Sequence, residues 1–235
     1  MSITAILTDI EGTTTDIQFV HKVLFPYARE HLSSFIRQHS SEPHVAAELA
    51  TVRAIIDEAE ASLDLVIQTL LSWIDTDQKV TPLKTLQGFI WTVGYQTGDF
   101  QGHLYPDAAE ALRTWHQAGL SLNVFSSGSI HAQKLLFGHS TAGDLTPLFS
   151  HYFDTTTGAK QSASSYETIA QQLGVPPQNV LFLSDVVAEL DAAKTAGMHS
   201  GLLARNSGSL NTPLPAATSH KCFSNFQEID LQVFS

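Results

Sequence analysis

The stretch Ile3–Asp16 reads ITAILTDIEGTTTD, and it decides the fold. It begins with Ile3–Thr8, a short apolar run rich in β-branched side chains, which is typical of a buried strand in a parallel sheet. Asp9 follows directly, Glu11 comes two residues later, and Gly12 allows a sharp turn. Chemistry collects beyond the carboxyl ends of strands in open α/β sheets, where two carboxylates can supply a nucleophile and a proton donor. An ordinary acidic turn is the alternative on this stretch alone.

The composition limits the classes of protein to which the chain can belong. The chain has 235 residues, 43% hydrophobic and 15% charged, which suits one large globular domain or a core with an insertion. Its 12 basic and 23 acidic residues give a net charge of −11, which disfavours nucleic acid and anionic membranes as partners. The same charge repels anionic small molecules, so a phosphorylated substrate would need a bound cation.

Cysteine usage and the N-terminus indicate the compartment. Cys222 is the single cysteine, which excludes an internal disulfide and suits a reducing environment. Residues Met1–Thr4 lack the basic and apolar regions of a signal peptide, and no apolar run reaches the length of a membrane span. We therefore expect a soluble, cytoplasmic protein that binds no membrane, and we expect a monomer.

Helical spacing dominates roughly residues 19–102. Apolar side chains recur there every three or four residues, as amphipathic helices require, and no strand pattern interrupts them. We predict a helical cap domain at 19–102, inserted into a core formed by residues 1–18 and 103–235. The four stripes comprise Val20, Val23, Leu24, Tyr27, His31 and Phe35; Val45, Leu49, Val52, Ile55 and Ile56; Leu63, Val66, Ile67, Leu70, Leu71 and Ile74; and Leu83, Leu86, Phe89, Ile90 and Val93.

From Tyr105 onward, strand and helix patterns alternate. This alternation predicts an α/β fold, a doubly wound, Rossmann-like parallel sheet with an all-helical insertion after its first strand. Residues 206–219 are rich in Ser, Asn, Pro and Gly and predict a loop. The further strands are expected at 122–125, 151–153, 180–183 and near 202–203, and the helices from about 105 to 119 and at 130–137, 162–173 and 187–196.

Polar residues suited to phosphate follow the second and third predicted strands. Ser126 and Ser127 open a helix, whose first N–H groups attract anions. Lys160 lies just past the third strand near a helix start, where the helix dipole also favours anions. A helix cap by Ser127 or Ser129 and a solvated surface lysine remain the simpler alternatives.

Acidic residues follow the fourth predicted strand. Asp185 comes directly after it, and Glu189 lies four residues further on. This spacing puts both carboxylates on one side of a helix start, where Mg²⁺ could share them. N-capping by Asp185 is the alternative.

The order of these residues resembles a known superfamily. Asp-x-Glu, then Ser, Lys and Asp, each at a strand end, is what a phosphoaspartyl hydrolase would require. The sequence resembles the haloacid dehalogenase superfamily of aspartate-nucleophile phosphatases and, more narrowly, the acireductone synthase family, the bifunctional enolase-phosphatases of methionine salvage. The similar stretches are Asp9–Thr15, Phe125–Ser129, Gln133–Ser140 and Leu181–Val186 in the core, with Leu24–Tyr27 and Leu86–Gly88 in the helical block.

The resemblance implies catalytic and metal-binding roles. Asp9 would be the nucleophile and a Mg²⁺ ligand, and Glu11 the acid/base, its backbone carbonyl also meeting the metal. Most superfamily phosphatases have Asp at this second position, whereas Glu is the acireductone synthase pattern. Asp185 would complete the site for one Mg²⁺ per subunit, and Glu189 would lie outside the direct ligands.

The resemblance also implies the substrate. Ser126, Ser127 and Lys160 would bind the phosphoryl group of 2,3-diketo-5-methylthiopentyl-1-phosphate. The enzyme would enolise this diketone and then hydrolyse the ester through a phosphoaspartyl intermediate. The enolase step rests on the resemblance alone.

Two rival functions use the same kind of sheet. A response-regulator receiver fits worse, because its phosphoacceptor Asp lies mid-chain, where the strand here ends in Ser126. A phosphotransferase or mutase would share the core, and steady phosphate release without an acceptor sugar would separate it from a hydrolase.

Overall fold

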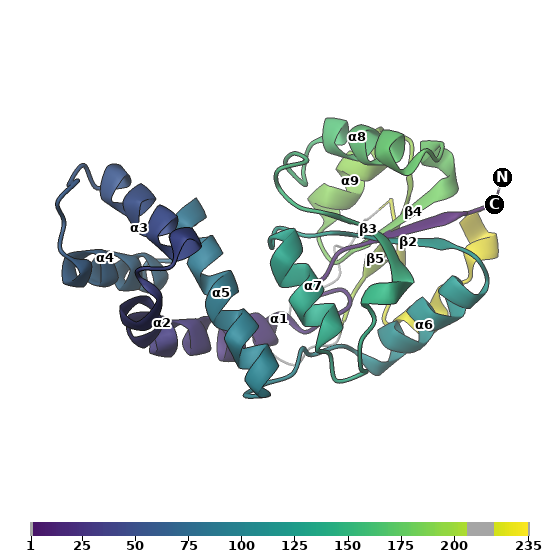
Figure 1. Cartoon of the computed structure of the whole chain (residues 1–235). Coiled ribbons are helices and arrows are strands. Elements are labelled where there is room, and N and C mark those ends of the chain that lie inside the picture. Colours follow the sequence, from purple (N-terminus) through teal and green to yellow (C-terminus); the bar gives the residue numbers. More distant parts are fainter. Residues whose placement is uncertain (1, 206–218, 235) are drawn as a thin grey trace. The chain divides into compact units, whose positions relative to one another are not determined.

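Figure 1 presents the computed structural model, which describes residues 2–205 and 219–234. Internal contacts divide the chain into two compact units. The α/β unit comprises Met1–Ile17 and Gly102–Ser235, and the helical unit comprises Gln18–Gln101. The predicted ends of the helical insertion lie within one residue of these boundaries.

The α/β unit is built on one six-stranded sheet. The strand order is β3-β2-β1-β4-β5-β6, and every neighbouring pair is parallel. The predicted fold class is therefore confirmed. The strands are β1 (Ala5–Thr8), β2 (Ser121–Phe125), β3 (Phe149–Phe153), β4 (Val180–Ser184), β5 (His199–Leu203) and β6 (Lys221–Phe223).

Strand β6 was not predicted from the sequence. Strand β6 has three residues, and Lys221 and Cys222 are exposed, so it offers no apolar run. Residues 206–218 of the predicted loop lie outside the described residues.

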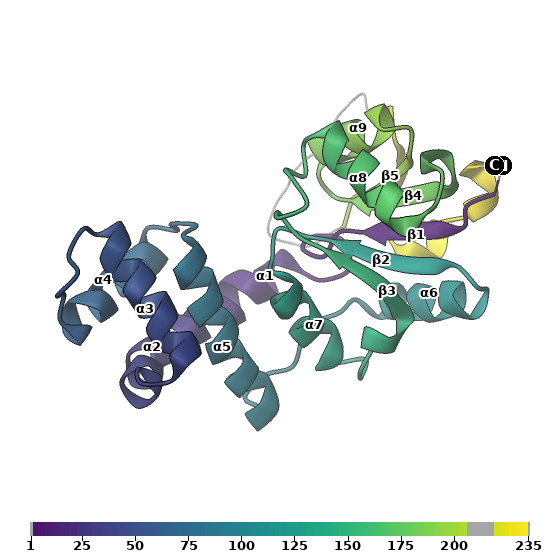
Figure 2. The same cartoon turned by 45° about the horizontal axis from the view of Figure 1, so that its top comes forward.

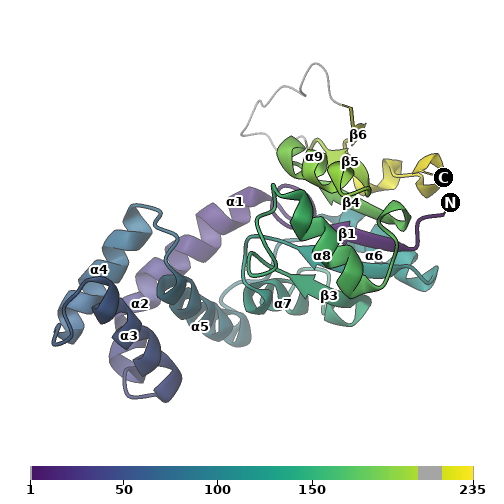
Figure 3. The ribbon, with the colours of Figure 1, turned by 90° about the horizontal axis from the view of Figure 1, so that it is seen from above.

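Helices cover both faces of this sheet. Figures 1 and 2 show α8 and α9 on one face and α6 and α7 on the other, and Figure 3 looks down onto α8 and α9. From β1 the chain runs outward to β2 and β3 on one side and then returns from β3 to β4 on the other side of β1, so the strand order reverses at β1. Ligands of such sheets bind at this reversal, beyond the carboxyl ends of the strands. The helices are α6 (Pro106–Gln117), α7 (Ile130–Gly138), α8 (Ala163–Leu173) and α9 (Val187–Thr195), with short 3₁₀ turns at Thr146–Leu148, Pro177–Asn179, Phe226–Glu228 and Leu231–Phe234.

The sheet core is apolar on both faces. All four residues of β1 are buried, as in strands of parallel sheets that helices cover on each side. One face packs under α8 and α9 through Leu7 of β1, Phe182 of β4 and Tyr166 of α8. Burial of this kind stabilises by about 25 cal/mol per Å² of apolar surface and fixes where the strand ends lie.

The helical unit contains four longer helices. Most buried side chains of α3, α4 and α5 lie in the predicted stripes, but the prediction was wrong for Ile55 and Val93, which are 50% and 41% exposed. Pro43 and Pro82 lie in the first turns of their helices. None of the described helices combines the length and the apolar character needed to cross a bilayer. The elements are α1 (Ile17–Phe19), a π-helical turn (Val20–Leu24), α2 (Phe25–His39), α3 (Pro43–Ile55), α4 (Leu63–Asp75) and α5 (Thr81–Thr97).

The first predicted stripe was right at Leu24, which is buried, but wrong in its phase within α2. The residues that α2 buries are Ala28, Leu32 and Ile36, whereas His31 and Phe35 are half-buried. The cause is the π-helical turn, in which the Phe25 N–H donates to the carbonyl five residues earlier. The extra residue in this turn shifts the buried face by one position.

The burial pattern predicts how two leucines differ. Leu32→Ala removes a side chain without solvent exposure and should lower the free energy of unfolding by about 2–5 kcal/mol. Leu65 of α4 is 41% exposed, and Leu65→Ala should cost less than about 0.5 kcal/mol. Urea denaturation followed by circular dichroism measures both. Equal losses would contradict the observed phase of α2.

Candidate active site

The turn after β1 fixes the first two acidic residues. The Asp9 N–H donates to the Leu183 carbonyl of β4 at 2.8 Å, which continues the sheet by one residue. The amides of the three threonines after Gly12 then converge on the Ile10 carbonyl at 2.9–3.1 Å. The Gly12 N–H closes the turn on the Thr15 carbonyl at 2.8 Å. Asp9 is buried at the sheet edge, and Glu11 is half-buried on the turn beside it.

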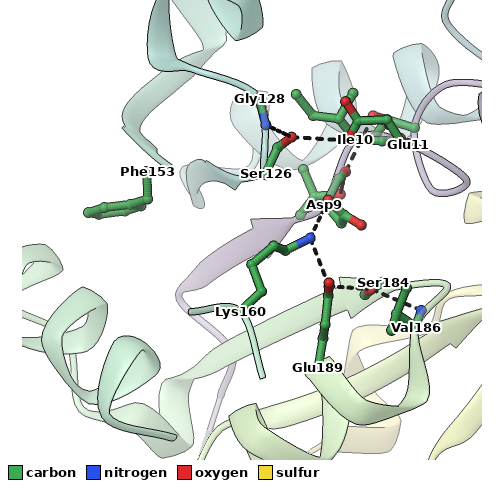
Figure 4. Close-up of polar contacts among 12 residues, drawn as sticks. Asp9, Ile10, Glu11, Ser126, Gly128, Phe153, Lys160, Ser184, Val186 and Glu189 are labelled. Atoms are coloured by element: carbon green, nitrogen blue, oxygen red, sulfur yellow. Dashed lines mark hydrogen bonds and ion pairs between the residues drawn. The ribbon is translucent and has the colours of Figure 1, made fainter. Parts of the chain in front are cut away.

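Lys160 joins two carboxylates at the centre of the site. Its Nζ lies 2.6 Å from Asp9 Oδ1 and 2.7 Å from Glu189 Oε2. Figure 4 draws both contacts as dashed lines. The buried Tyr166 hydroxyl donates to the Lys160 carbonyl at 2.7 Å and anchors its backbone. Burial lowers the pKa of Lys160, but Asp9 and Glu189 raise it more, so its net pKa lies above the ordinary value. The solvated-lysine alternative is wrong, and α8 begins at Ala163, three residues after this lysine.

Ser126 connects the second strand end to the acidic turn. Its buried hydroxyl donates to Glu11 Oε2 at 3.0 Å and accepts the Gly128 N–H at 3.1 Å. Ser127 follows with an exposed side chain. The capping alternative applies to Ser129, whose hydroxyl caps α7.

Asp185 meets the same turn from the other side. It does not cap α9, because the N-cap residue is Val186. A Cβ on Gly12 would fall 2.1 Å from Asp185 Oδ2, so the carboxylate lies directly against the backbone that follows Glu11. Asp185 is an exposed residue. Even so, partial burial of its carboxyl group, and then the negative charge of Asp9, raise the pKa of Asp185 to about 7.

Glu189 links the lysine to the turn that carries Asp185. Besides Lys160 Nζ, its Oε2 accepts the Ser184 hydroxyl at 3.0 Å, and Ser184 Oγ accepts the Val186 N–H at 3.1 Å. Burial and then Asp9 raise the pKa of Glu189, and the same two causes raise the pKa of Glu11.

The donor set fits a divalent cation. One ammonium group faces four carboxylates, those of Asp9, Glu11, Asp185 and Glu189, so negative charge exceeds positive charge. Carboxylate and carbonyl oxygens are the donors that Mg²⁺ takes. In the described part of the chain no three acidic, His or Cys side chains form a metal cluster. That observation is compatible with the expected ligand set, in which only Asp9 and Asp185 bind through side chains and Glu11 binds through its backbone.

Two supporting residues were not predicted. Ser184 bridges Glu189 to the β4–α9 turn, and Gln133 of α7 donates from Nε2 to the carbonyls of Gly128 and Phe153 at 2.8 Å each. Gln133 therefore ties the serine turn to the end of β3. Its one sequence signal is a polar side chain on the buried face of α7.

Fold and site together define a class of hydrolase. The family model for hydrolases described as haloacid dehalogenase-like matches residues 3–197, and the chain belongs to this family. The L-2-haloacid dehalogenase structure from Xanthobacter autotrophicus has the same fold, with a TM-score of 0.55 and 20% identity over 95% of each chain.

Further relatives define the particular family. Proteins named enolase-phosphatase E1 from Pseudomonas aeruginosa (strain UCBPP-PA14) and Pectobacterium atrosepticum are 59% and 52% identical, over 90% and 99% of this chain and 94% and 99% of theirs. The UTR4 crystal structure from Saccharomyces cerevisiae aligns with a TM-score of 0.83 at 31% identity, over 97% of this chain and 100% of that one. The chain therefore belongs to the enolase-phosphatase family, which confirms the resemblance.

The close approach of Asp185 predicts a specific glycine requirement. Gly12 and Gly119 both have positive φ, +75° and +86°, but a Cβ at Gly119 would meet nothing within 4 Å. Each change to Ala should cost about 1–2 kcal/mol of stability through backbone strain. Only Gly12→Ala should also lower phosphate release, by roughly 100-fold, because it displaces Asp185. Equal activity in the two folded variants would show that the packing of Asp185 on Gly12 is unimportant.

Proposed function

We propose that this protein is a Mg²⁺-dependent enolase-phosphatase of methionine salvage. It enolises 2,3-diketo-5-methylthiopentyl-1-phosphate and then hydrolyses the phosphate ester to give acireductone. The observation that carries this proposal is the Lys160–Asp9 ion pair beside Ser126, which unites a carboxylate nucleophile with phosphate-binding groups. The relatives named enolase-phosphatase support the two linked activities.

Asp9 acts as the nucleophile in the hydrolytic half. The Asp9 carboxylate, paired with the ammonium group of Lys160, attacks phosphorus and forms an acyl phosphate as the substrate oxygen leaves. An ammonium group has three donors, and Asp9 and Glu189 use two of them. The third can reach a phosphoryl oxygen, with the Ser127 hydroxyl as a further donor and Ser126 next to it on the same turn. Lys160 thereby neutralises charge on the transferred group, which is the main demand of phosphoryl transfer.

Glu11 acts as the acid and then as the base. Burial and Asp9 raise its pKa, so it keeps a proton more readily than a solvated glutamate. It donates that proton to the leaving oxygen and later takes one from the water that attacks the acyl phosphate. The Ser126 hydroxyl, 3.0 Å from Glu11 Oε2, orients the carboxyl group in both steps.

The metal and the cap complete the proposal. One Mg²⁺ per subunit, held by Asp9, the Glu11 carbonyl and Asp185, would supply Lewis-acid polarisation of the substrate carbonyls and charge neutralisation. The helical unit, Gln18–Gln101, serves as the cap domain. A phosphorylated diketone is the expected partner, and a monomeric state and a cytoplasmic location stay predictions.

Removing the central cation should weaken catalysis. Lys160→Ala leaves Asp9 and Glu189 without their counter-ion and should lower kcat/KM roughly 100-fold or more. Lys194→Ala is the matched control, because Lys194 is exposed on α9 and donates to Ser219. Steady-state phosphate release measures both variants. Wild-type kinetics in Lys160→Ala would remove this residue from the site.

A change at the nucleophile should separate the two activities. Asp9→Asn keeps a carbonyl oxygen for Mg²⁺ but cannot form a stable acyl phosphate. It should release no phosphate, yet still exchange the acidic carbon-bound proton of the substrate in heavy water, as mass spectrometry can detect. Some loss of exchange is expected because one negative charge at the metal is removed.

The controls decide what a negative result means. Excess chelator should stop phosphate release by the wild type, and added Mg²⁺ should restore it. If exchange vanishes in Asp9→Asn while Mg²⁺ still binds, Asp9 itself takes part in enolisation. A wild type that releases phosphate without proton exchange or enol absorbance is a simple phosphatase.

A further inference from the structure

A second segment of the α/β unit holds the turn that carries Glu11. The Tyr105 N–H donates to the Thr14 carbonyl at 3.0 Å, and the Thr15 hydroxyl donates to the His103 carbonyl at 2.5 Å. The Asp16 N–H donates to His103 Nδ1 at 3.0 Å. Three consecutive residues of the turn are therefore bound by one short segment, 103–105, far away in sequence.

The contacts of His103 define its protonation state. A backbone N–H can only donate, so Nδ1 must present a free lone pair to Asp16. The Thr15 hydroxyl lies 3.0 Å from the same nitrogen, but its one proton goes to the His103 carbonyl, so the Asp16 N–H is the donor to Nδ1. A proton on Nδ1 would face the Asp16 N–H and break this bond. The geometry therefore selects the neutral imidazole that carries its proton on Nε2.

The surroundings of His103 shift its pKa in opposite directions. Burial lowers its pKa, Asp16 raises it and Arg205 lowers it, and the net pKa is below the ordinary value. Arg205 is held by Asp107 at 2.7 Å, and the Tyr105 ring meets the imidazole edge-on at 4.9 Å between centroids. Because the folded-state pKa is lowered, the neutral form dominates at neutral pH and is lost only as pH falls through that value.

Thr15 transmits this contact to the acidic turn. Its carbonyl accepts the Gly12 N–H at 2.8 Å, and Glu11 and Thr15 form an isolated β-bridge. If Thr15 moves, the turn opens, and the 3.0 Å hydrogen bond from the Ser126 hydroxyl to Glu11 Oε2 is lost. His103 thus acts on Glu11 through Thr15 and through the turn they share.

We propose that His103 is a positioning residue for the acid/base step, holding the Glu11 turn through the free lone pair of its Nδ1. The proposal rests on the proposed function only for the role of Glu11. The turn carries the proton donor and the Glu11 carbonyl proposed for Mg²⁺, but neither Ser127 nor Lys160, so at saturating Mg²⁺ the effect should fall on kcat and leave KM nearly unchanged.

Two variants at position 103 test the acceptor. His103→Asn can place Oδ1 where Nδ1 was and keep an acceptor, whereas His103→Leu has similar bulk and no acceptor. His103→Leu should lower kcat by roughly 10- to 100-fold, the loss expected from a displacement of about 1 Å. His103→Asn should recover most of that loss. Because Asn does not titrate, the fall of kcat at low pH that is caused by protonation of His103 should be absent in this variant. His116→Leu, an exposed position on α6, is the control.

A measurement without substrate separates this proposal from the proposed function. Nitrogen-15 NMR of imidazole-labelled protein at neutral pH should show His103 with its proton on Nε2 and a bare Nδ1. A proton on Nδ1, or folded Asn and Leu variants with equal kcat, would overturn the proposal. If the wild type shows no enolase-phosphatase activity, the proposed function fails, and the NMR result still decides whether His103 accepts from the turn.

Discussion

The site depends on one ammonium group held between two buried carboxylates. Lys160 lies 2.6 Å from Asp9 and 2.7 Å from Glu189, and all three side chains are at most 10% exposed. Burying ions costs several kcal/mol each unless their geometry and hydrogen bonds compensate. The Ser184 hydroxyl, which donates to Glu189 Oε2, supplies part of that compensation. The result is a buried carboxyl group paired with an ammonium group in a place from which water is largely excluded.

The sheet order explains why these groups meet at all. Asp9 ends the central strand, and the turns after β2 and β4 lie on either side of it. Ser126 and Asp185 follow those neighbouring strands, so residues more than 100 positions apart share one edge. The remaining excess of carboxylates is local to this edge and matches the acidic balance of the whole chain. An anionic substrate can enter only if cations offset this charge, which is the physical reason for Lys160 and for a divalent metal.

The sequence was informative wherever function follows from strand ends. Short apolar runs located the first five strands, and Asp9, Ser126, Lys160 and Asp185 could be placed because parallel strands end at a common edge. The phase of α2 could not be predicted, because the π-helical turn before it adds a residue that regular helical spacing does not include, and this shifts the buried face to Leu32. The partners of Gln133 and His103 were equally out of reach, since long-range hydrogen bonds are set by three-dimensional positions and leave no periodic pattern.

The central claim is that Asp9 carries the phosphoryl group during turnover. Rapid acid quenching of the wild type during turnover, followed by proteolysis and mass spectrometry, tests it most directly. We expect a phosphorylated peptide that contains Asp9, present early in turnover and absent when substrate is exhausted. Phosphate release with no phosphorylated peptide, or with the label on a different residue, would contradict the account.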